Sequence, residues 1–195
     1  KHFKSNERTT LNKMRGKDAF KILIACLLSL RARDETTETI SENLFKIADT
    51  PEKISKINLR KLEKIIYSSG HYHKKARTLK HVSKEIINRF NGKVPDNELA
   101  LLSIKGIGRK TANIVMNFAF GKQAIPVDTH CHRIPNRLGW VKTKTPEKTE
   151  QELMNIIPKK YWHDLNNLLV AHGQNVCVPI SPFCSKCAIR QYCQR

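Results

Sequence analysis

The chain has 195 residues, with 36 lysines and arginines against 17 aspartates and glutamates, which gives a formal net charge of +19. No apolar run is long enough to cross a membrane, and the polar, basic residues 1–16 do not form a secretory signal. We therefore expect an intracellular protein, in the cytoplasm or nucleoid, that binds a polyanion. Composition alone leaves DNA, RNA and an anionic membrane surface open.

The predicted elements are helices throughout, so the expected fold class is all-α. Residues 18–30 are apolar on nearly every side and predict a buried central helix. Elsewhere apolar residues recur three and four positions apart, as in amphipathic helices. Thr50-Pro51 fits a helix start and Asn91-Gly92 a helix stop. The other expected helices are 36–47, 51–56, 59–67, 73–90, 97–103, 109–120, 130–138, 147–156 and 159–172, with an extended stretch at 124–129.

Residues 102–112 place two glycines one residue apart between two predicted helices. Gly106 and Gly108 are expected to allow positive φ and a close approach of another backbone. The second helix then begins with exposed N–H groups and partial positive charge, where a phosphate can bind. Many helix pairs turn through glycines without a ligand, but here Arg109 and Lys110 follow directly. We therefore predict a phosphate-binding hairpin.

Two residues near the hairpin have both an ordinary and a chemical interpretation. Most lysines are solvated surface charges, but Lys110 falls in the first turn of a predicted helix. The partial positive charge at that end of the helix disfavours the ammonium form. A neutral amine is what nucleophilic attack requires. Asp128 precedes Thr129-His130, and an aspartate in that position is a natural helix cap.

Four of the six cysteines lie in the last nineteen residues, as Cys177-x6-Cys184-x2-Cys187-x5-Cys193. Four thiolates in so short a loop can hold a metal centre. Zinc is one alternative, although zinc sites usually have two Cys-x2-Cys pairs and this segment has one. Two disulfides are another, disfavoured without a secretory signal. The spacing favours an iron–sulfur centre moderately over zinc. The other cysteines and three aromatic residues are expected in the core: Cys26, Cys131, Trp140, Trp162 and Phe183.

Three motifs in register resemble the endonuclease III family of DNA base-excision-repair glycosylases, in the helix-hairpin-helix superfamily. They are the hairpin at 102–112, the segment 125–130 around Asp128, and the terminal cysteine quartet. The likeness runs from about residue 20 to the end. It implies two helical lobes, one of residues 17–122 with the hairpin and a discontinuous one of residues 1–16 and 123–195. The second lobe would carry a [4Fe-4S] cluster on Cys177, Cys184, Cys187 and Cys193.

The resemblance also implies an enzyme, a DNA N-glycosylase and abasic-site lyase that acts as a monomer on double-stranded DNA with damaged bases or abasic sites. Lys110 would attack the sugar C1′, expel the base and form a Schiff base, and β-elimination would then nick the strand. Asp128 would stabilise the oxocarbenium-like sugar and help to take the proton from Lys110. Oxidised or reduced pyrimidines are the expected targets in base excision repair.

A base inside a duplex must be flipped out before its sugar can be attacked. The family fills the gap from two loops, which align with residues 29–34 and 70–72. Arg31 stands where the family usually has a glutamine, and His71 where it has a hydrophobic wedge. Arg31, His71 and Tyr72 are thus candidate DNA-binding residues, although His71 and Tyr72 could equally pack on the following helix.

The cysteine segment departs from the family at residues 178–183, where relatives commonly carry basic residues and this chain has none. Lys186 and Arg190 lie just beyond and are the candidate substitutes for contact with the DNA backbone. The alternative is that both are solvated surface charges.

Four other functions are alternatives to this one. Adenine-DNA glycosylases of the superfamily need a glutamate in the segment that matches residues 21–30, which has none. Mismatch-specific thymine glycosylases lack the lysine present at position 110. A non-catalytic DNA-binding module would bind DNA but form no Schiff base. An iron–sulfur redox carrier would have no use for the hairpin or for so large a positive charge.

Overall fold

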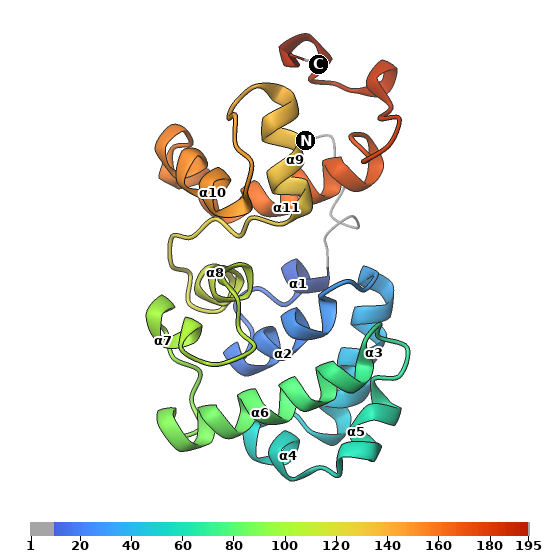
Figure 1. The fold of residues 1–195 in the computed structure, drawn as a ribbon, viewed down its shortest axis with the longest axis vertical. Helices are drawn as coiled ribbons and strands as arrows, with labels where there is room; N and C mark the ends of the chain where they lie inside the picture. The colour runs from blue at the N-terminus through green and yellow to red at the C-terminus, as the bar shows by residue number, and fades with distance from the viewer. Residues whose placement is uncertain (1–9, 195) are drawn as a thin grey trace. The chain divides into compact units, whose positions relative to one another are not determined.

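The structure, a computed structural model, describes residues 10–194, apart from the side chains of residues 10 and 12. These residues are helical with no strand, which confirms the all-α class (Figure 1). No helix among them is long and apolar enough to cross a membrane. In chain order the elements are α1 (Thr10–Lys13), α2 (Ala19–Ser29), α3 (Asp34–Ile47), α4 (Pro51–Lys56), α5 (Leu59–Ile65), α6 (Tyr72–Phe90), α7 (Glu98–Leu102), α8 (Arg109–Phe118), α9 (Thr129–Leu138), α10 (Pro146–Ile156), η2 (Lys159–Tyr161), α11 (Trp162–Asn175), η3 (Cys184–Lys186) and η4 (Arg190–Tyr192).

The described residues divide into two compact units, Thr10–Lys122 and the chain from Gln123 onward. The structure differs from the predicted domains at residues 10–16, which the sequence placed with the second one. Helix α1 packs against α2 and α3, and Leu11 shares an apolar cluster with Ile22, so the first unit includes these residues. The same prediction for residues 1–9 lies outside the described residues.

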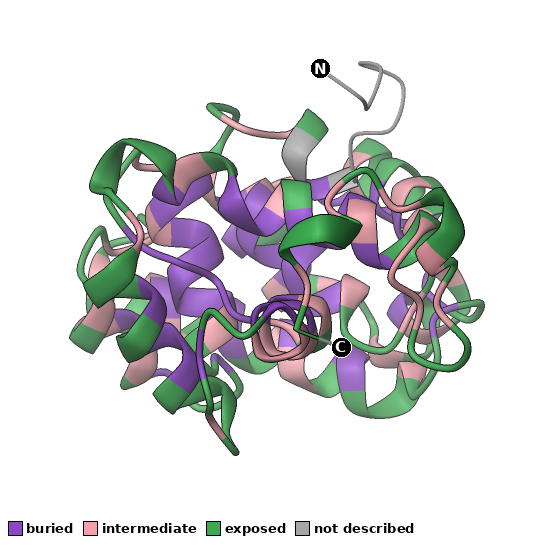
Figure 2. Ribbon diagram, turned by 90° about the horizontal axis from the view of Figure 1, so that it is seen from above, coloured by how far each residue is buried: buried purple, intermediate pink, exposed green. Residues whose placement is uncertain are grey.

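Helix α2 is the centre of the first unit. Phe20 and every residue from 22 to 28 are buried, as predicted for an apolar helix. Figure 2 shows the buried stretches of the ribbon in purple. Helices α3, α6 and α8 pack against it, and α4 and α5 pack against α6 in turn. Cys26 is fully buried among these apolar residues, as expected. The core thus fixes α2, α6 and α8, the three helices that border the predicted hairpin and base-flipping loops.

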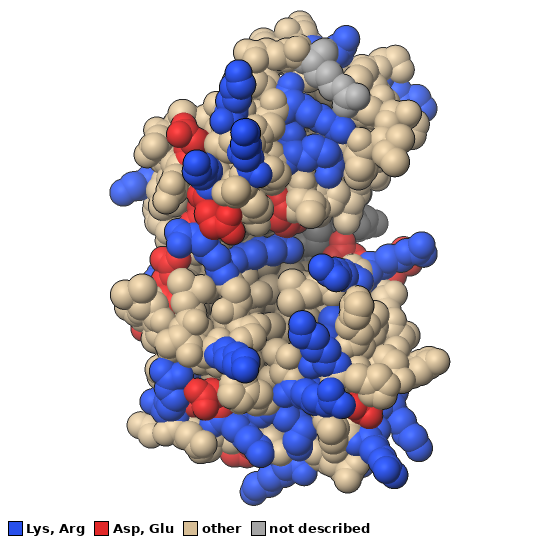
Figure 3. Space-filling model, in the orientation of Figure 1, with Lys and Arg blue, Asp and Glu red and all other residues tan. Residues whose placement is uncertain are grey.

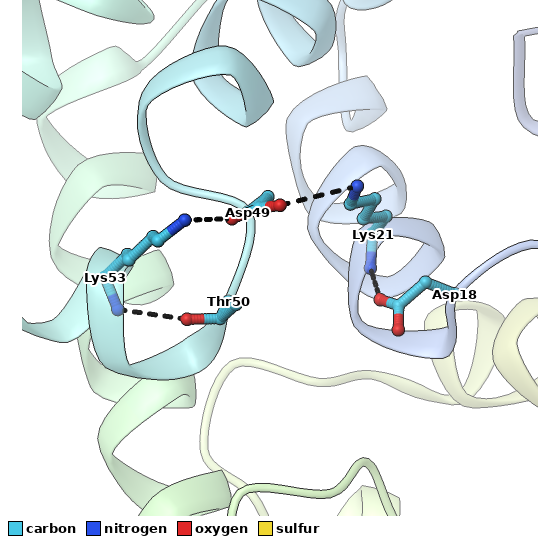
Figure 4. Close-up of polar contacts among 5 residues, drawn as sticks. All are labelled: Asp18, Lys21, Asp49, Thr50 and Lys53. Carbon is cyan, nitrogen blue, oxygen red and sulfur yellow. Dashed lines mark hydrogen bonds and ion pairs between the residues drawn. The ribbon is translucent and has the colours of Figure 1, made fainter.

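Side-chain caps and one shared carboxylate fix the starts of α2 and α4 (Figure 4). The Asp18 carboxylate accepts from the Lys21 backbone N–H, and the Thr50 hydroxyl accepts from that of Lys53, which confirms the predicted start at Thr50. Asp49 forms ion pairs with Lys53 at 2.8 Å and with Lys21 at 3.7 Å. The hydrogen bond from Lys53 is the main reason that the pKa of Asp49 is lowered.

The second unit is built around α9, which packs against both α10 and α11. Trp162 is 4% exposed, as predicted for a core residue, and its indole N–H donates to the Ile157 carbonyl at 2.8 Å. Cys131 is also fully buried, as predicted. Trp140 and Phe183 were predicted to be buried, and this is wrong: 41% and 51% of their surfaces are exposed. Trp140 lies just after the end of α9 and Phe183 just before the start of η3, both in connecting segments at the surface.

Helices α9 and α11 cross closely at Gly173. A β-carbon added there would lie 2.2 Å from Nδ1 of His130 and 3.0 Å from Nη2 of Arg133. The same guanidinium nitrogen approaches the Gly173 carbonyl at 3.4 Å. A glycine is therefore required at this crossing by the proximity of α9.

We predict that Gly173→Ala lowers the free energy of unfolding by about 1–3 kcal/mol, because the added methyl overpacks the contact between α9 and α11. Urea denaturation measures this. Gln174→Ala, at the next and exposed position of α11, is the matched control and should change stability by less than about 0.5 kcal/mol. Equal losses in the two variants would contradict the packing argument.

Candidate active site

The predicted hairpin is formed by α7, a turn and α8. Ile104 and Ile107 are buried and anchor the turn, while Gly106 has φ of 105°. A β-carbon on Gly106 would lie 2.8 Å from Cγ2 of Thr78 on α6. Gly106 therefore has the predicted positive φ, but the group that approaches it closely is the Thr78 side chain and not another backbone. Gly108 has neither a positive φ nor a close neighbour, since its φ is −94° and open space surrounds it; it is the N-cap residue of α8.

Lys110 is the second residue of α8, as predicted, and is half-buried. It follows Arg109, which forms an ion pair with Glu98 of α7 at 3.7 Å. Burial raises the pKa of the Cys26 thiol on α2, and the charge of Lys110 acts in the opposite direction. The amine therefore lies close enough to the buried end of α2 to affect a thiol there.

Asp128 is the N-cap residue of α9, so the ordinary interpretation of this aspartate is confirmed. Its Oδ1 accepts hydrogen bonds from the backbone N–H groups of His130 and Cys131, both at 2.9 Å. The extended segment before it is held by Asn166, whose side-chain amide donates to the Pro126 carbonyl at 2.8 Å. The carboxylate is thus fixed at the positive end of a helix. Lys110 belongs to the first unit and Asp128 to the second.

Three of the predicted DNA-binding residues line one pocket in the first unit. Arg31, from the loop after α2, His71, from the loop before α6, and Gly106 all border it. Arg31 and His71 are in the left-handed region, with φ of 56° and 60°, which non-glycine residues rarely adopt. The rest of the lining is Leu27, Leu30, Lys74, Lys75 and Thr78. No acidic side chain is among these lining residues.

Tyr72 was predicted to act with His71, but its ring packs at a tilt against those of its neighbours. The centroid distances are 5.0 Å to Tyr67 and 4.0 Å to His73, and His73 is in turn 2.9 Å from Glu63. Tyr72 is not among the described lining residues of the pocket. The arrangement matches the alternative interpretation, in which Tyr72 packs on its own helix.

Lys75 is a residue of this pocket that sequence reasoning missed. Only 8% of its surface is exposed, and burial lowers its pKa from 10.5 to about 8. The sequence signal was its position: Lys75 occupies the core-facing side of α6, in register with Leu79, Val82 and Ile86. A lysine at such a position needs polar partners in the interior.

The four C-terminal cysteines are free thiols that line one pocket in the second unit. Across residues 10–194, however, no three His, Cys, Asp or Glu side chains are grouped so that they could hold a metal ion. The predicted ligands therefore share a pocket without forming a ready metal site.

Two arginines of α9 hold the start of the cysteine segment. Arg137 donates to Sγ of Cys177 at 3.4 Å and to the Val178 and Pro179 carbonyls at 2.7 and 2.6 Å. Arg133 donates to the Cys177 carbonyl at 2.9 Å.

Of the two basic candidates in this segment, Arg190 lines the cysteine pocket. Lys186 lies in η3 and is exposed, outside the described lining of that pocket. Lysine and arginine side chains are spread widely over the visible face of the first unit (Figure 3). This distribution is the one expected of a surface that meets a polyanion.

Comparison with known proteins gives a consistent result. Residues 24–159 match a family model described as HhH-GPD superfamily base excision DNA repair protein. Endonuclease III of Thermotoga maritima is 41% identical over 100% of this chain and 88% of its own length. Endonuclease III of Escherichia coli K12 is 34% identical over 90% of this chain and 83% of its own length.

Solved structures agree with this. A trapped endonuclease III–DNA covalent intermediate is 35% identical with a TM-score of 0.87, covering 91% of this chain and 84% of that one. A thermostable thymine-DNA glycosylase is 28% identical with a TM-score of 0.84, covering 95% of this chain and 87% of that one. The chain belongs to the HhH-GPD superfamily of base excision DNA repair proteins and, within it, to the endonuclease III family.

The two hairpin glycines make a matched pair for mutation. We predict that Gly106→Ala lowers the free energy of unfolding by about 1–3 kcal/mol, because alanine is strained at positive φ and its methyl meets Thr78. Gly108→Ala should cost less than about 1 kcal/mol, since only the quality of the N-cap changes. Urea denaturation of both variants checks this, and a Gly108→Ala loss as large as that of Gly106→Ala would contradict it.

Proposed function

We propose that this chain releases oxidised or reduced pyrimidines from duplex DNA and then nicks the strand, with Lys110 as the nucleophile and Asp128 as the catalytic carboxylate. As a member of the endonuclease III family, the chain is a base excision repair glycosylase and lyase. The observation that carries the residue assignment is the position of Lys110 in the first turn of α8, directly after the glycine turn.

The proposed reaction uses the Lys110 amine twice. The nitrogen lone pair attacks C1′ of the flipped nucleotide, the N-glycosidic bond breaks, and the base leaves with a proton. The sugar ring then opens: the C1′–O4′ bond breaks, O4′ takes up a proton, and the nitrogen lone pair forms a C=N bond, which gives a protonated Schiff base between Nζ and C1′. Removal of a proton from C2′ then expels the 3′ phosphate by β-elimination, and water releases the amine.

Asp128 is proposed to stabilise the positive charge that develops on the sugar as the base leaves. Its Oδ1 accepts two backbone hydrogen bonds, and these hold the carboxylate in one orientation. The cap and the catalytic role are therefore compatible, because the cap fixes the position of the charge.

DNA binding is proposed to involve the hairpin and the basic pocket. The N-terminal end of α8 offers backbone N–H groups to a phosphate, and open space around Gly108 leaves room for it. Arg31 and His71 project from two loops into the pocket that also holds Lys74. The Arg31 guanidinium and the His71 imidazole are planar groups that suit the gap left in a duplex by a flipped nucleotide.

The four cysteines are proposed to hold a [4Fe-4S] cluster. The residues fit the group: four free thiols line one pocket, and Arg137 offers a donor to the sulfur of Cys177. Hydrogen bonds and positive charge of this kind accompany thiolate clusters. Metal binding supplies the free energy that gathers such ligands. The cluster would fix the fold of residues 177–193 against α9, and no step of the reaction passes through it.

We predict that Lys110→Ala abolishes borohydride trapping on DNA with an abasic site or a thymine glycol, because no amine remains to form the Schiff base. Denaturing gels of the trapped complex measure this. Lys105→Ala, which removes an exposed lysine from the same hairpin, is the control and should trap fully at saturating protein. Normal trapping by Lys110→Ala would refute Lys110 as the nucleophile. If the unmutated chain released only thymine from a T·G mismatch, the alternative function of a mismatch glycosylase would be favoured.

For Asp128 the prediction separates charge from capping. Asp128→Asn should reduce base release by about 100-fold or more while the free energy of unfolding stays within about 0.5 kcal/mol, since asparagine caps helices as well as aspartate. Asp128→Ala should lose activity and also about 1 kcal/mol of stability. Single-turnover base release and urea denaturation give the two readouts. An active Asp128→Asn enzyme would restrict Asp128 to the cap.

The metal prediction is tested by elemental analysis. The purified protein should contain about four iron and four sulfide per chain, with absorbance near 400 nm, as a four-iron cluster requires. Cys187→Ser should lose most of the iron, whereas Cys26→Ser, at a cysteine outside the segment, should keep it. Stoichiometric zinc, or a disulfide between two of the four cysteines, would contradict the proposal.

A further inference from the structure

The buried Lys75 ammonium joins the two loops that flank the basic pocket. Its Nζ donates to the Leu28 carbonyl at 2.7 Å and to Oγ of Ser69 at 2.5 Å. The Ser69 hydroxyl also donates to the Leu28 carbonyl at 3.3 Å. Leu28 and Ser69 are fully buried. Three groups from three parts of the chain therefore meet in one closed hydrogen-bonded cluster.

Each partner of Lys75 lies shortly before a predicted DNA-binding residue. Leu28 is in the last turn of α2, where carbonyls lack partners within the helix and a cation is favourable, and Arg31 follows three residues later. Ser69 precedes His71 by two residues. The two loops also touch, because a β-carbon on Gly70 would lie 3.5 Å from the Arg31 carbonyl.

The residues that the loops present are both held in an unfavourable backbone conformation. Arg31 and His71 have positive φ, and such residues persist only where the surroundings enforce the conformation. Lys75 is one turn into α6, and its own backbone N–H donates to the His71 carbonyl at 3.0 Å. The hydrogen bonds of Lys75 thus act on both sides of the pair, at the end of α2 and at the start of α6.

We propose that Lys75 is a positioning residue for base flipping: its ammonium holds the loops of Arg31 and His71 at the spacing needed to fill the gap in the duplex. This inference rests on the proposed function. Burial lowers the pKa of Lys75 to about 8, so the folded chain disfavours the charge at this position. An ammonium there is not explained by packing alone. Arg31 and Lys74 also line the pocket, so the ammonium shares it with two like charges.

The experiment compares two substrates with the full chain as purified. One is a duplex with thymine glycol, where the loops must separate the strands; the other is a single-stranded oligonucleotide with an abasic site, which leaves no gap to fill. Lys75→Met should lower single-turnover base release from the duplex at least tenfold and change nicking of the single strand less than twofold. Lys75→Arg, which keeps the charge and the donors, should recover most of the loss. Lys84→Met removes an exposed lysine from the same helix and should match the unmutated chain on both substrates.

A second readout needs no catalysis. In a duplex with 2-aminopurine opposite a tetrahydrofuran abasic analogue, saturating protein should raise the fluorescence as the opposite base is unstacked, and Lys75→Met should lose more than half of that rise. Ser69→Ala, a milder change, should lose part of it. Equal behaviour of Lys75→Met and Lys84→Met would overturn the proposal. Parallel loss of duplex and single-strand activity with a normal fluorescence rise would overturn it too. Absence of base release and nicking by the unmutated chain on the duplex would instead refute the proposed function.

Discussion

The contact between the hairpin and α6 is the constraint on which the first unit depends. Gly106 can approach Thr78 only because it has no side chain, and that approach sets where α8 begins and so where Lys110 lies. The same helix starts at the His71 loop and carries Lys75, which is bonded to the end of α2. The proposed nucleophile and both proposed base-flipping loops are therefore positioned by one helix. Changes at its core face are expected to affect all three together.

In the second unit α9 has the corresponding role. Its first turn is capped by Asp128, and its later turns carry Arg133 and Arg137, which bind the backbone of the cysteine segment. The proposed catalytic carboxylate and the proposed cluster thus share one rigid element. The cysteine segment can therefore affect catalysis without taking part in it, because it supports the helix whose N-terminus holds the carboxylate.

The sequence predicted what depends on local pattern and missed what depends on tertiary neighbours. An almost uniformly apolar run located the central helix at 18–30, which the structure has as Ala19–Ser29, because a helix buried on all sides must be apolar on all sides. The prediction of positive φ was right at Gly106 and wrong at Gly108, because a Gly-x-Gly pattern does not reveal which of its glycines takes positive φ. Trp140 and Phe183 were misplaced for a similar reason, because aromatic character does not reveal where a surface turn lies. Lys75 was missed because only the folded chain brings Ser69 and Leu28 to it.

Lys75 also bears on why the chain is better understood as an enzyme than as a module that only grips DNA. A net charge of +19 gives salt-dependent binding whichever lysines supply it, so binding alone requires no buried cation. The pKa of Lys75 falls to about 8 in the folded chain, below its ordinary 10.5. Keeping the ammonium charged therefore destabilises the fold at neutral pH, and this cost disappears only as the pH rises through 8 to above 10.5. An apolar residue of similar size would avoid the cost. The presence of Lys75 beside two residues at positive φ is the pattern expected where stability is exchanged for a defined site geometry.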